Sequence, residues 1–273
     1  HFSLDDNWKN QFVKLHFLGV NYRAWVYVNG HFVGEHEGGN TPFSLNVSKY
    51  VQPGKDNVIA VRVNRRADFD SYTSPDAKPV TNDTELPYKP VDYWRYAGIT
   101  RSVYLEATSQ VTVSKILTST GDHTLTTKVV VYNHGDKQAH RQLVVNPGNQ
   151  TGGKQQSREI TLKPGEVKVV SFDFTIPNAA FWSPESPTLY KVTASLYKGK
   201  GIGQSKQNGK GSVDDSLSTN YGMRTIAVEG SKLTLNGDQL FLKGLNWHEE
   251  TAENGKSMTI EEYDTELNHV LNV

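Results

Sequence analysis

The chain has 273 residues, which is enough for two domains or one large one. Its 29 Lys and Arg residues balance its 29 Asp and Glu residues, so the formal net charge is zero. This balance argues against nucleic acid or an anionic membrane as the main partner, because both attract clustered positive charge. The sequence has no cysteine for a disulfide or a thiolate metal site, and no apolar run approaches the roughly 18 residues of a membrane-spanning helix.

The first part of the chain has the pattern of antiparallel strands. Residues 12–18 and 22–28 alternate polar and apolar side chains, which is typical of half-buried strands. Asn29-Gly30 then predicts a type I′ hairpin turn, because both of its positions require positive φ. The same patterns predict further strands at residues 31–36, 42–47, 57–63 and 99–105.

These strands predict a jelly-roll sandwich over residues 1–107. Residues 64–96 interrupt it with a long irregular stretch, which in a compact domain is usually functional or mobile. The sequence begins at His1 without a methionine and still follows a helical pattern at its end, so we expect a fragment of a longer protein. The sandwich would then lack its first strands and would have an unpaired sheet edge near residues 12–18.

A second run of strands predicts an immunoglobulin-like sandwich over residues 108–229. Turn signals such as Asn133-His134-Gly135-Asp136 separate these strands. Residues 199–218 are rich in Gly, Ser and Lys, which indicates a loop. The predicted strands are residues 111–117, 125–132, 155–162, 167–174, 189–197 and 221–228.

Residues 230–273 change in character. A hairpin around Asn236-Gly237 and a short apolar strand at 241–245 precede a polar loop and a helix. Thr259 and Glu262 have the spacing of a capping box. The helix carries an apolar stripe of Tyr263, Leu267, Val270 and Leu271. One strand and one helix cannot bury their own faces, so this β/α unit predicts a larger α/β domain.

The densest run of specific side chains is PVDYWRYAGITRSVYLE, residues 90–106. Asp92 stands beside Tyr93, Trp94 and Arg95, and a predicted strand follows the loop. A loop with an acid and aromatic rings, mounted on a strand, could hold a ligand of the size of a sugar.

Four segments in a fixed order resemble glycoside hydrolase family 2, which contains β-galactosidases, β-glucuronidases and β-mannosidases. They are FLGVNYRAWVYVNGHFVGEHEGGNTPFSLNVSKYVQPGKDNVIAVRV, DYWRYAGITRSVYLE, FWSPESPTLY and YGMRTIAVEGSKLTLNGDQLFLKGLNWHEE. The resemblance implies a mainly β fold: a jelly-roll sugar-binding domain, an immunoglobulin-like sandwich and the truncated opening of a catalytic (β/α)₈ TIM barrel.

The resemblance also implies a retaining exo-β-glycosidase that uses two glutamates, with carboxyl groups about 5–5.5 Å apart. In the family these glutamates follow on later barrel strands, so we assign no catalytic residue here and expect the chain alone to be inactive. β-Galactosidase is our first interpretation, and β-glucuronidase or β-mannosidase are alternatives. A non-catalytic carbohydrate-binding sandwich protein is a further alternative, against which the β/α unit argues.

Asp92 and Trp94, which precede the YAGI motif at residues 96–99, are candidate substrate contacts. The resemblance implies that Asp92 reaches into the barrel mouth, where its carboxylate would accept hydrogen bonds from two neighbouring sugar hydroxyls. The alternative is an Asp that binds loop N–H groups. Trp94 could stack on a sugar or pack its own loop, and we favour packing. Arg95 and Arg101 are expected to be structural ion-pair partners.

Three further candidates follow the predicted strand at 241–245. The family motif reads Asn-Arg-His-Glu, which corresponds here to Asn246, Trp247, His248 and Glu249. The resemblance implies that His248 lines the sugar pocket, with Asn246 and Glu249 beside it, whereas Trp247 replaces the family's Arg. The alternative is a loop histidine held by hydrogen bonds. A zinc site is not predicted, because one His beside adjacent acids does not supply the ligands.

The expected partner is a β-linked oligosaccharide or glycoside, with neither nucleic acid nor a membrane. The resemblance implies no organic cofactor, although Na⁺ or Mg²⁺ is possible in the full-length enzyme, where Asp92 would help to hold sodium. It also implies that the full-length protein is a homo-oligomer.

Overall fold

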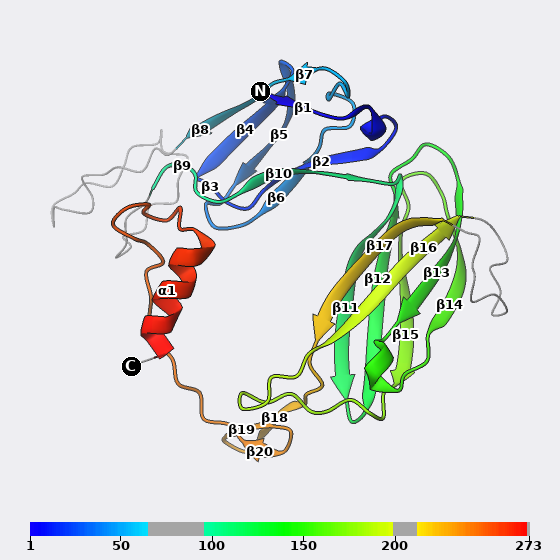
Figure 1. The fold of residues 1–273 in the computed structure, drawn as a ribbon, viewed down its shortest axis with the longest axis vertical. Coiled ribbons are helices and arrows are strands. Elements are labelled where there is room, and N and C mark those ends of the chain that lie inside the picture. Colours follow the sequence, from blue (N-terminus) through cyan, green and yellow to red (C-terminus); the bar gives the residue numbers. More distant parts are fainter. Residues whose placement is uncertain (65–95, 199–211, 272–273) are drawn as a thin grey trace. The chain divides into compact units, whose positions relative to one another are not determined.

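The computed structural model describes residues 1–64, 96–198 and 212–271 (Figure 1). The chain divides into two units. The first contains His1–Ala107 and Leu245–Val273, and the second contains Thr108–Gly244. The described part of the chain is mainly β, as predicted, and contains no helix long and apolar enough to cross a membrane.

The first unit is built on two antiparallel three-stranded sheets, in the orders β10-β2-β6 and β5-β4-β8. Two short pairs, β1-β7 and β3-β9, form separate two-stranded sheets. The strands are β1 Phe2–Ser3, β2 Phe12–Phe17, β3 Val20–Asn21, β4 Arg23–Val28, β5 His31–Glu37, β6 Phe43–Asn46, β7 Asp56–Asn57, β8 Ile59–Asn64, β9 Gly98–Ile99 and β10 Val103–Thr108. A 3₁₀ turn, Asp6–Trp8, lies between β1 and β2.

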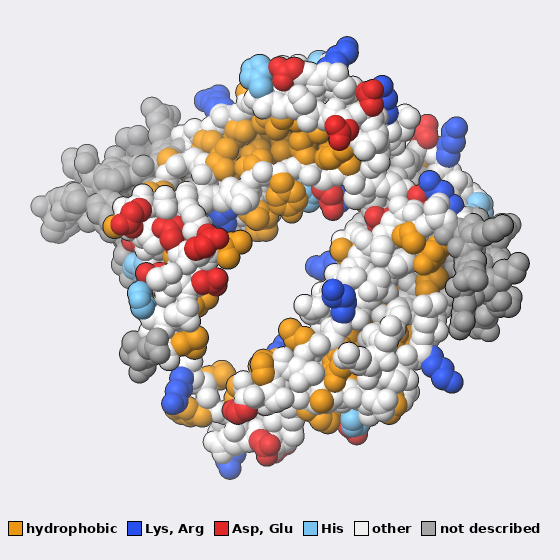
Figure 2. Space-filling model, viewed as in Figure 1, with side chains coloured by type: hydrophobic (Ala, Val, Ile, Leu, Met, Phe, Trp, Pro, Cys, Tyr) orange, Lys and Arg blue, Asp and Glu red, His pale blue; other side chains and the backbone are white. Residues whose placement is uncertain are grey.

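Alternation along the strands builds the core of this sandwich. In β4, Ala24, Val26 and Val28 are buried, whereas the residues between them are partly exposed. Leu15 and Phe17 of β2 join the same core. Several core-packed residues remain only partly buried, and Figure 2 shows a broad hydrophobic area on this unit. They include Phe43, Leu45, Ile59, Val61 and Val63.

The predicted hairpin turn is confirmed, since Asn29 and Gly30 have φ of 49° and 81°. The expected unpaired edge at residues 12–18 is wrong, because β2 lies between β10 and β6 and pairs on both sides. Two strands distant in the sequence supply this pairing, and the local pattern of residues 12–18 contains no information about them.

The second unit is an immunoglobulin-like sandwich, as predicted. One sheet has the order β11-β12-β15 and the other β14-β13-β16-β17. The strands are β11 Val111–Gly121, β12 Thr124–Asn133, β13 Ala139–Asn146, β14 Gln156–Leu162, β15 Val167–Thr175, β16 Tyr190–Lys198 and β17 Val213–Tyr221. A 3₁₀ turn, Asn149–Thr151, follows β13. Fully buried residues such as Leu143, Phe172 and Leu196 form the core between the sheets.

Two strands of this sandwich differ from the prediction. β13 was not predicted, yet it lies between β14 and β16 and buries Leu143 and Val145. The loop predicted at residues 199–218 is wrong for its last part, because β17 begins at Val213. The last strand predicted at 221–228 is also wrong, because β17 ends at Tyr221 and residues 226–229 belong to a separate small sheet. Cross-strand hydrogen bonds between hydroxyls hold β17 on β16, at Thr193–Ser218 (2.8 Å) and Ser195–Ser216 (3.0 Å). Residues 199–211 lie outside the described residues.

The last part of the chain holds a small sheet and one helix. β18 Ile226–Glu229, β19 Lys232–Leu235 and β20 Asp238–Gln239 form the sheet, which includes the predicted hairpin around Asn236-Gly237. The strand predicted at 241–245 is not formed: residues 240–250 have no regular secondary structure, and Phe241 is 79% exposed. No described strand pairs with this segment, and a strand needs a partner for its N–H and C=O groups.

The predicted helix is confirmed as α1, Ile260–Leu271. Thr259 and Glu262 form a reciprocal capping box: Glu262 N donates to Thr259 Oγ1 (3.3 Å), and Thr259 N donates to Glu262 Oε2 (2.7 Å). Acidic side chains gather over α1 (Figure 2). Its apolar residues Leu267 and Leu271 are exposed, as expected of a helix whose partner surface is not among the described residues. The barrel to which it would belong stays a prediction.

Candidate functional site

The predicted substrate contacts divide into two groups. Asp92 and Trp94, with Tyr93 and Arg95, lie outside the described residues. Asn246, His248 and Glu249 lie in the loop between Leu245 and α1, with exposed side chains. The described residues that come directly after the Asp92 segment, Tyr96 to Arg101, contact this loop in the first unit.

An ion pair joins the two segments. Arg101 Nη2 lies 3.4 Å from Glu249 Oε2, and the side chains are 42% and 49% exposed. This confirms the expectation that Arg101 is an ion-pair partner, and it identifies a predicted site residue as the other member. A half-exposed pair contributes at most about 1 kcal/mol, so its main effect is to restrict where the Glu249 carboxylate can lie.

Tyr96 packs on the same loop. Its carbonyl accepts a hydrogen bond from the Asn21 amide of β3, which holds the residue against the sandwich. Its ring covers Gly255, where a Cβ would lie 2.6 Å from Tyr96 Cε1. Gly255 has φ +53°, which favours glycine, and it exchanges two backbone hydrogen bonds with Thr251 (2.9 and 3.1 Å). The tight turn at 251–255 therefore brings the loop backbone directly against the aromatic ring.

Glu250 interacts with the Tyr96 hydroxyl and also with Lys256, which has further charged neighbours. Burial raises the pKa of Tyr96, and the charge and hydrogen bond of Glu250 raise it further. Burial lowers the pKa of Lys256, as does the charge of Arg101, although Glu250 and Glu249 oppose the shift. Glu250 Oε2 is buried and has no hydrogen-bond partner among the described residues. We call these five residues, Tyr96, Arg101, Glu249, Glu250 and Lys256, the Tyr96 cluster.

The other side of the loop is fixed to α1. Glu262 Oε1 accepts hydrogen bonds from Thr251 Oγ1 (3.0 Å) and Asn254 Nδ2 (2.9 Å). Trp247 meets Tyr263 edge to face, with ring centroids 6.0 Å apart. The loop that carries His248 is thus held on one side by the helix cap and on the other by Tyr96 and Arg101. Carboxylates that accept and cations that donate are the groups that bind sugar hydroxyls, so this loop has suitable chemistry.

The Tyr96 cluster was largely missed from sequence. Tyr96 belongs to the YAGI motif that was singled out, but Glu250 and Lys256 were not proposed as its neighbours. Contacts such as Arg101–Glu249 join residues 148 positions apart, and no local pattern predicts them.

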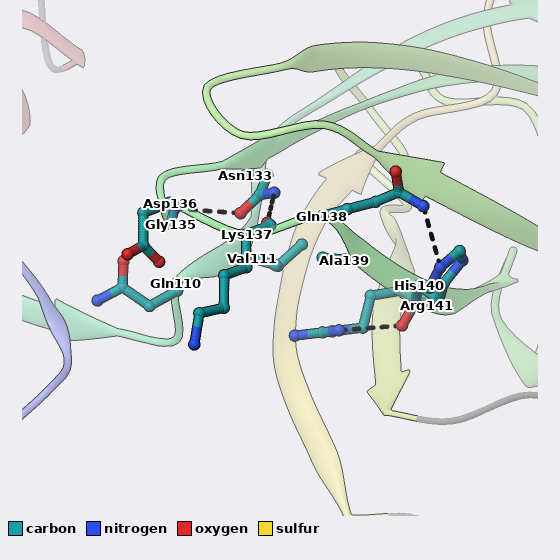
Figure 3. Close-up of a pocket in the computed structure, with 10 residues that line it drawn as sticks. All are labelled: Gln110, Val111, Asn133, Gly135, Asp136, Lys137, Gln138, Ala139, His140 and Arg141. Atoms are coloured by element: carbon teal, nitrogen blue, oxygen red, sulfur yellow. Dashed lines mark hydrogen bonds between the residues drawn. The ribbon is translucent and has the colours of Figure 1, made fainter.

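Two cavities of the described residues lie in the second unit, away from this loop. One, of about 450 Å³, lies at the β12–β13 turn of the second unit and contains none of the predicted site residues (Figure 3). Asn133 lines this cavity. Its Nδ2 donates to the Lys137 carbonyl (2.8 Å), and its Oδ1 accepts from Gly135 N (3.1 Å). These polar groups serve the predicted turn. Another cavity, of about 400 Å³, lies beside Gly148 and Tyr190.

The possible cation of the full-length enzyme remains a prediction. The described residues contain no group of three His, Cys, Asp or Glu residues arranged around one point. Asp92, the residue implied for sodium, lies outside them.

Comparison with known proteins gives consistent matches along the chain. Residues 1–109 match the sugar binding domain of glycosyl hydrolases family 2, and residues 103–224 match a second domain of that family. A β-galactosidase of Priestia megaterium is 29% identical over 94% of this chain and 23% of its own length. A β-glucuronidase of Felis catus is 29% identical over 89% of this chain and 37% of its own length.

Solved structures of related enzymes align with nearly the whole chain. A family 2 β-galacturonidase from Eisenbergiella tayi, bound to galacturonate, aligns with 98% of this chain and 42% of its own, at 26% identity and a TM-score of 0.74. A putative β-galactosidase from Bacteroides fragilis has a TM-score of 0.78 at 24% identity, covering 98% of this chain and 39% of its own. The chain spans less than a third of the first curated relatives, 23% and 31% of two β-galactosidases.

Proposed function

Because this chain belongs to glycoside hydrolase family 2, we propose that the protein that carries it is a retaining exo-β-glycosidase, with β-galactosidase as the first candidate. The observation that carries the proposal is the succession of two family domains in one chain. Two relatives named β-galactosidase align with 94% and 91% of the chain.

In this proposal the chain positions the sugar and does not cleave it. Retaining hydrolysis needs one carboxylic acid to protonate the leaving oxygen and one carboxylate to attack the anomeric carbon. We assign neither role to a residue of this chain. Asp92 would accept hydrogen bonds from two sugar hydroxyls, Asn246 and His248 would contact the same sugar, and Trp94 would pack the loop that carries Asp92.

Glu249 would act with Arg101. The guanidinium occupies Glu249 Oε2, which leaves the other carboxylate oxygen directed by the ion pair and able to accept from a hydroxyl. The Tyr96 cluster would then set the position of the His248 loop relative to the sandwich. Contacts that position the sugar raise the catalytic rate only if they hold the sugar in its reactive geometry.

β-Glucuronidase is the second candidate, favoured by relatives of that name. They are 28%, 26% and 29% identical over 92%, 94% and 89% of this chain. The two substrates differ in the group on C5, which is a hydroxymethyl group in the galactoside and a carboxylate in the glucuronide, and in the configuration of the hydroxyl at C4. Parallel assays with nitrophenyl β-galactoside and β-glucuronide distinguish the two candidates.

The first experiment compares the 273-residue chain with the full-length protein. We expect the full-length protein to release nitrophenol and the chain alone to release none above background. Turnover by the chain itself would overturn the assignment of the catalytic carboxylates to another part of the protein. A full-length protein that cleaves neither glycoside but binds β-linked oligosaccharides would favour a non-catalytic carbohydrate-binding protein.

The second experiment tests Asp92 in the full-length protein. Asp92→Ala should lower kcat/KM by about 10-fold to 100-fold. This is the loss expected when one or two hydrogen bonds to a charged group are removed from the transition state. Asp122→Ala removes an exposed Asp from the second sandwich and serves as the matched control. Equal kcat/KM values for the two variants would show that Asp92 does not contact the substrate.

A further inference from the structure

The outer face of the sheet β10-β2-β6 carries side chains that the proposed function does not use. On β2, Leu15 and Phe17 point into the core, so Lys14 and His16 project from the opposite face. On β10, Leu105 packs against the core, so Tyr104 and Glu106 project outward as well. We call Lys14, His16, Tyr104 and Glu106 the β2–β10 face.

An exposed aromatic ring on this face, that of Tyr104, is restrained by stacking. The Tyr104 ring stacks on the His16 ring, with centroids 4.7 Å apart and planes 9° apart. Tyr104 nevertheless remains 47% exposed. Because β10 is an edge strand, the side of the ring away from His16 is not faced by another strand of the sheet. A rigid ring of this kind offers a flat apolar surface at little cost in conformational entropy.

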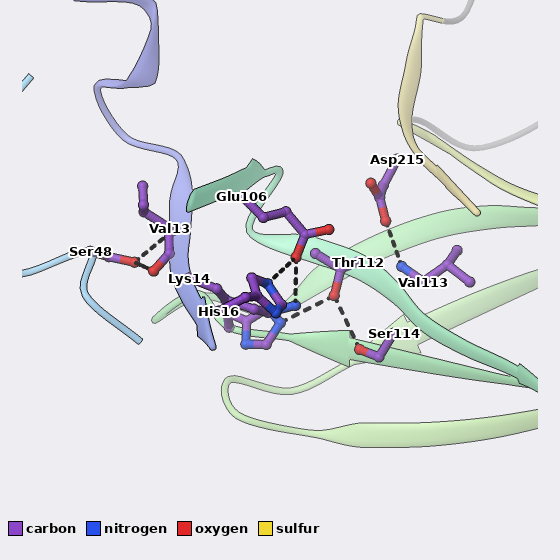
Figure 4. Close-up of polar contacts among 10 residues, drawn as sticks. Val13, Lys14, His16, Ser48, Glu106, Thr112, Val113, Ser114 and Asp215 are labelled. Carbon is purple, nitrogen blue, oxygen red and sulfur yellow. Dashed lines mark hydrogen bonds and ion pairs between the residues drawn. The ribbon is translucent and has the colours of Figure 1, made fainter. Parts of the chain in front are cut away.

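The Glu106 carboxylate lies on the same face, and its two oxygens have different hydrogen-bond partners. Glu106 Oε2 accepts from His16 Nε2 (3.0 Å) and from Lys14 Nζ (3.4 Å), whereas Oε1 points away from both (Figure 4). Burial acts to raise the pKa of Glu106, but the Lys14 charge and the hydrogen bonds from His16 and Lys14 outweigh it and lower the pKa. Glu106 is therefore an ionised acceptor held by Oε2, and its Oε1 takes no part in the bonds to His16 and Lys14.

We propose that the β2–β10 face is a second carbohydrate-binding site, specific for neutral sugars, with Tyr104 stacked on a pyranose ring and Glu106 Oε1 accepting from its hydroxyls. Sugars present apolar C–H groups on the face of the ring and hydroxyls at its edge. They therefore match an aromatic surface flanked by an acceptor and by the ammonium donor of Lys14. A uronic acid would place its carboxylate near Glu106, so neutral sugars fit better.

This site is separate from the His248 loop. Arg101, which contacts that loop, precedes β10, whereas Tyr104 and Glu106 lie within it. The proposal goes beyond the proposed function, since binding on the β2–β10 face requires neither the loop nor hydrolysis.

The test is an NMR titration of the isotope-labelled 273-residue chain with β-1,4-galactotetraose, and in parallel with β-linked digalacturonic acid. We expect the galactotetraose to shift the Tyr104 ring signals. Tyr104→Ala should weaken binding by about tenfold, and Tyr104→Phe, which keeps the ring, should bind within about twofold of the original chain. Glu106→Gln should weaken binding by about fivefold to tenfold. It retains the side-chain shape, so it stays informative if Tyr104→Ala lowers stability.

Two variants serve as controls. Phe32→Ala removes another exposed ring of the same sandwich, 51% exposed in the original chain, and should leave binding unchanged. His248→Ala alters the predicted pocket of the proposed function and should leave the shift of the Tyr104 ring signals unchanged. Loss of binding in His248→Ala but not in Tyr104→Ala would place the ligand at the loop and overturn this proposal alone. An absence of binding to galactotetraose, or equal binding of digalacturonic acid, would also overturn it.

Discussion

Tyr221 shows how a single buried hydroxyl joins strand β17 to the segment after β13 in the second sandwich. Its Oη donates to the Pro147 carbonyl at 2.7 Å, and the residue is only 4% exposed. Burial raises the pKa of Tyr221 to about 12, and a hydrogen bond from Thr151 does not offset this effect. The folded protein therefore retains the neutral phenol at pH values at which an unfolded chain would ionise it.

A loss of stability at alkaline pH follows. A raised folded-state pKa means that the contribution is complete below about pH 10 and is lost as pH rises to about 12. The loss should reach about 2–3 kcal/mol, measured by urea unfolding at several pH values. Tyr221→Phe should lower stability at pH 7 by about 1 kcal/mol and remove this part of the pH dependence. Tyr197→Phe, with Tyr221 intact, should preserve it.

A second prediction concerns the contact between Gly255 and Tyr96. Gly255→Ala should cost about 1–3 kcal/mol locally, because φ is +53° and the new Cβ would lie 2.6 Å from the ring. Hydrogen exchange at the Thr251 and Gly255 amides should become faster by at least tenfold. Gly244→Ala is the control, since a Cβ there meets no atom within 4 Å. Unchanged exchange in Gly255→Ala would show that Tyr96 does not restrain the loop.

At the scale of the element, α1 depends on its cap more than on burial. No residue of the helix is buried, so packing contributes little, and isolated helices of this length are marginal in water. The Thr259–Glu262 capping box satisfies two N–H groups, and Glu262 also binds Thr251 and Asn254 of the loop. The same carboxylate thus starts the helix and fixes the loop that carries His248.

Removal of the cap should therefore affect both elements. Thr259→Ala should destabilise α1 by about 1 kcal/mol, seen as lower helical circular dichroism and faster amide exchange in residues 260–264. Thr265→Ala removes the same hydroxyl from the helix interior, where it only donates to the Glu261 carbonyl, and should have little effect. If both variants exchange alike, the cap does not control the helix.

The elements that sequence predicted best are those specified by their own residues. The Asn29-Gly30 turn and the alternation in β2 and β4 require no distant partner, and the capping box is contained in four residues. β13 was missed although Leu143 and Val145 alternate in it, because Arg141 and Gln142 weaken the pattern. β17 is rich in Ser and Asp, and its pairing depends on hydroxyl partners on β16.

The candidate site was less predictable than the fold. The motifs pointed to Asn246, His248 and Glu249, and the structure describes these residues on one loop. The neighbours that fix this loop, Tyr96 and Arg101, come from the other end of the first unit's sequence. Their pairing is a tertiary contact, so it could not follow from periodicity or turn chemistry. Asp92 and Trp94 lie outside the described residues and remain predictions.

At the scale of the whole molecule, the two units have separate hydrophobic cores. Each core should therefore produce its own unfolding transition. Leu143→Ala should destabilise the second unit by about 2–5 kcal/mol, and Leu15→Ala the first by a similar amount. Calorimetry of the two variants should show one shifted transition each. A common shift of a single transition would show that the units unfold together.

The central claim is that this chain is the sugar-positioning part of a retaining β-glycosidase. The most direct test is proton NMR of the full-length protein during cleavage of nitrophenyl β-galactoside, with nitrophenyl β-glucuronide in parallel. Retention predicts that the β-anomer of the free sugar appears first and converts to the α-anomer only by slow mutarotation. First release of the α-anomer, or cleavage of neither substrate, would contradict the claim.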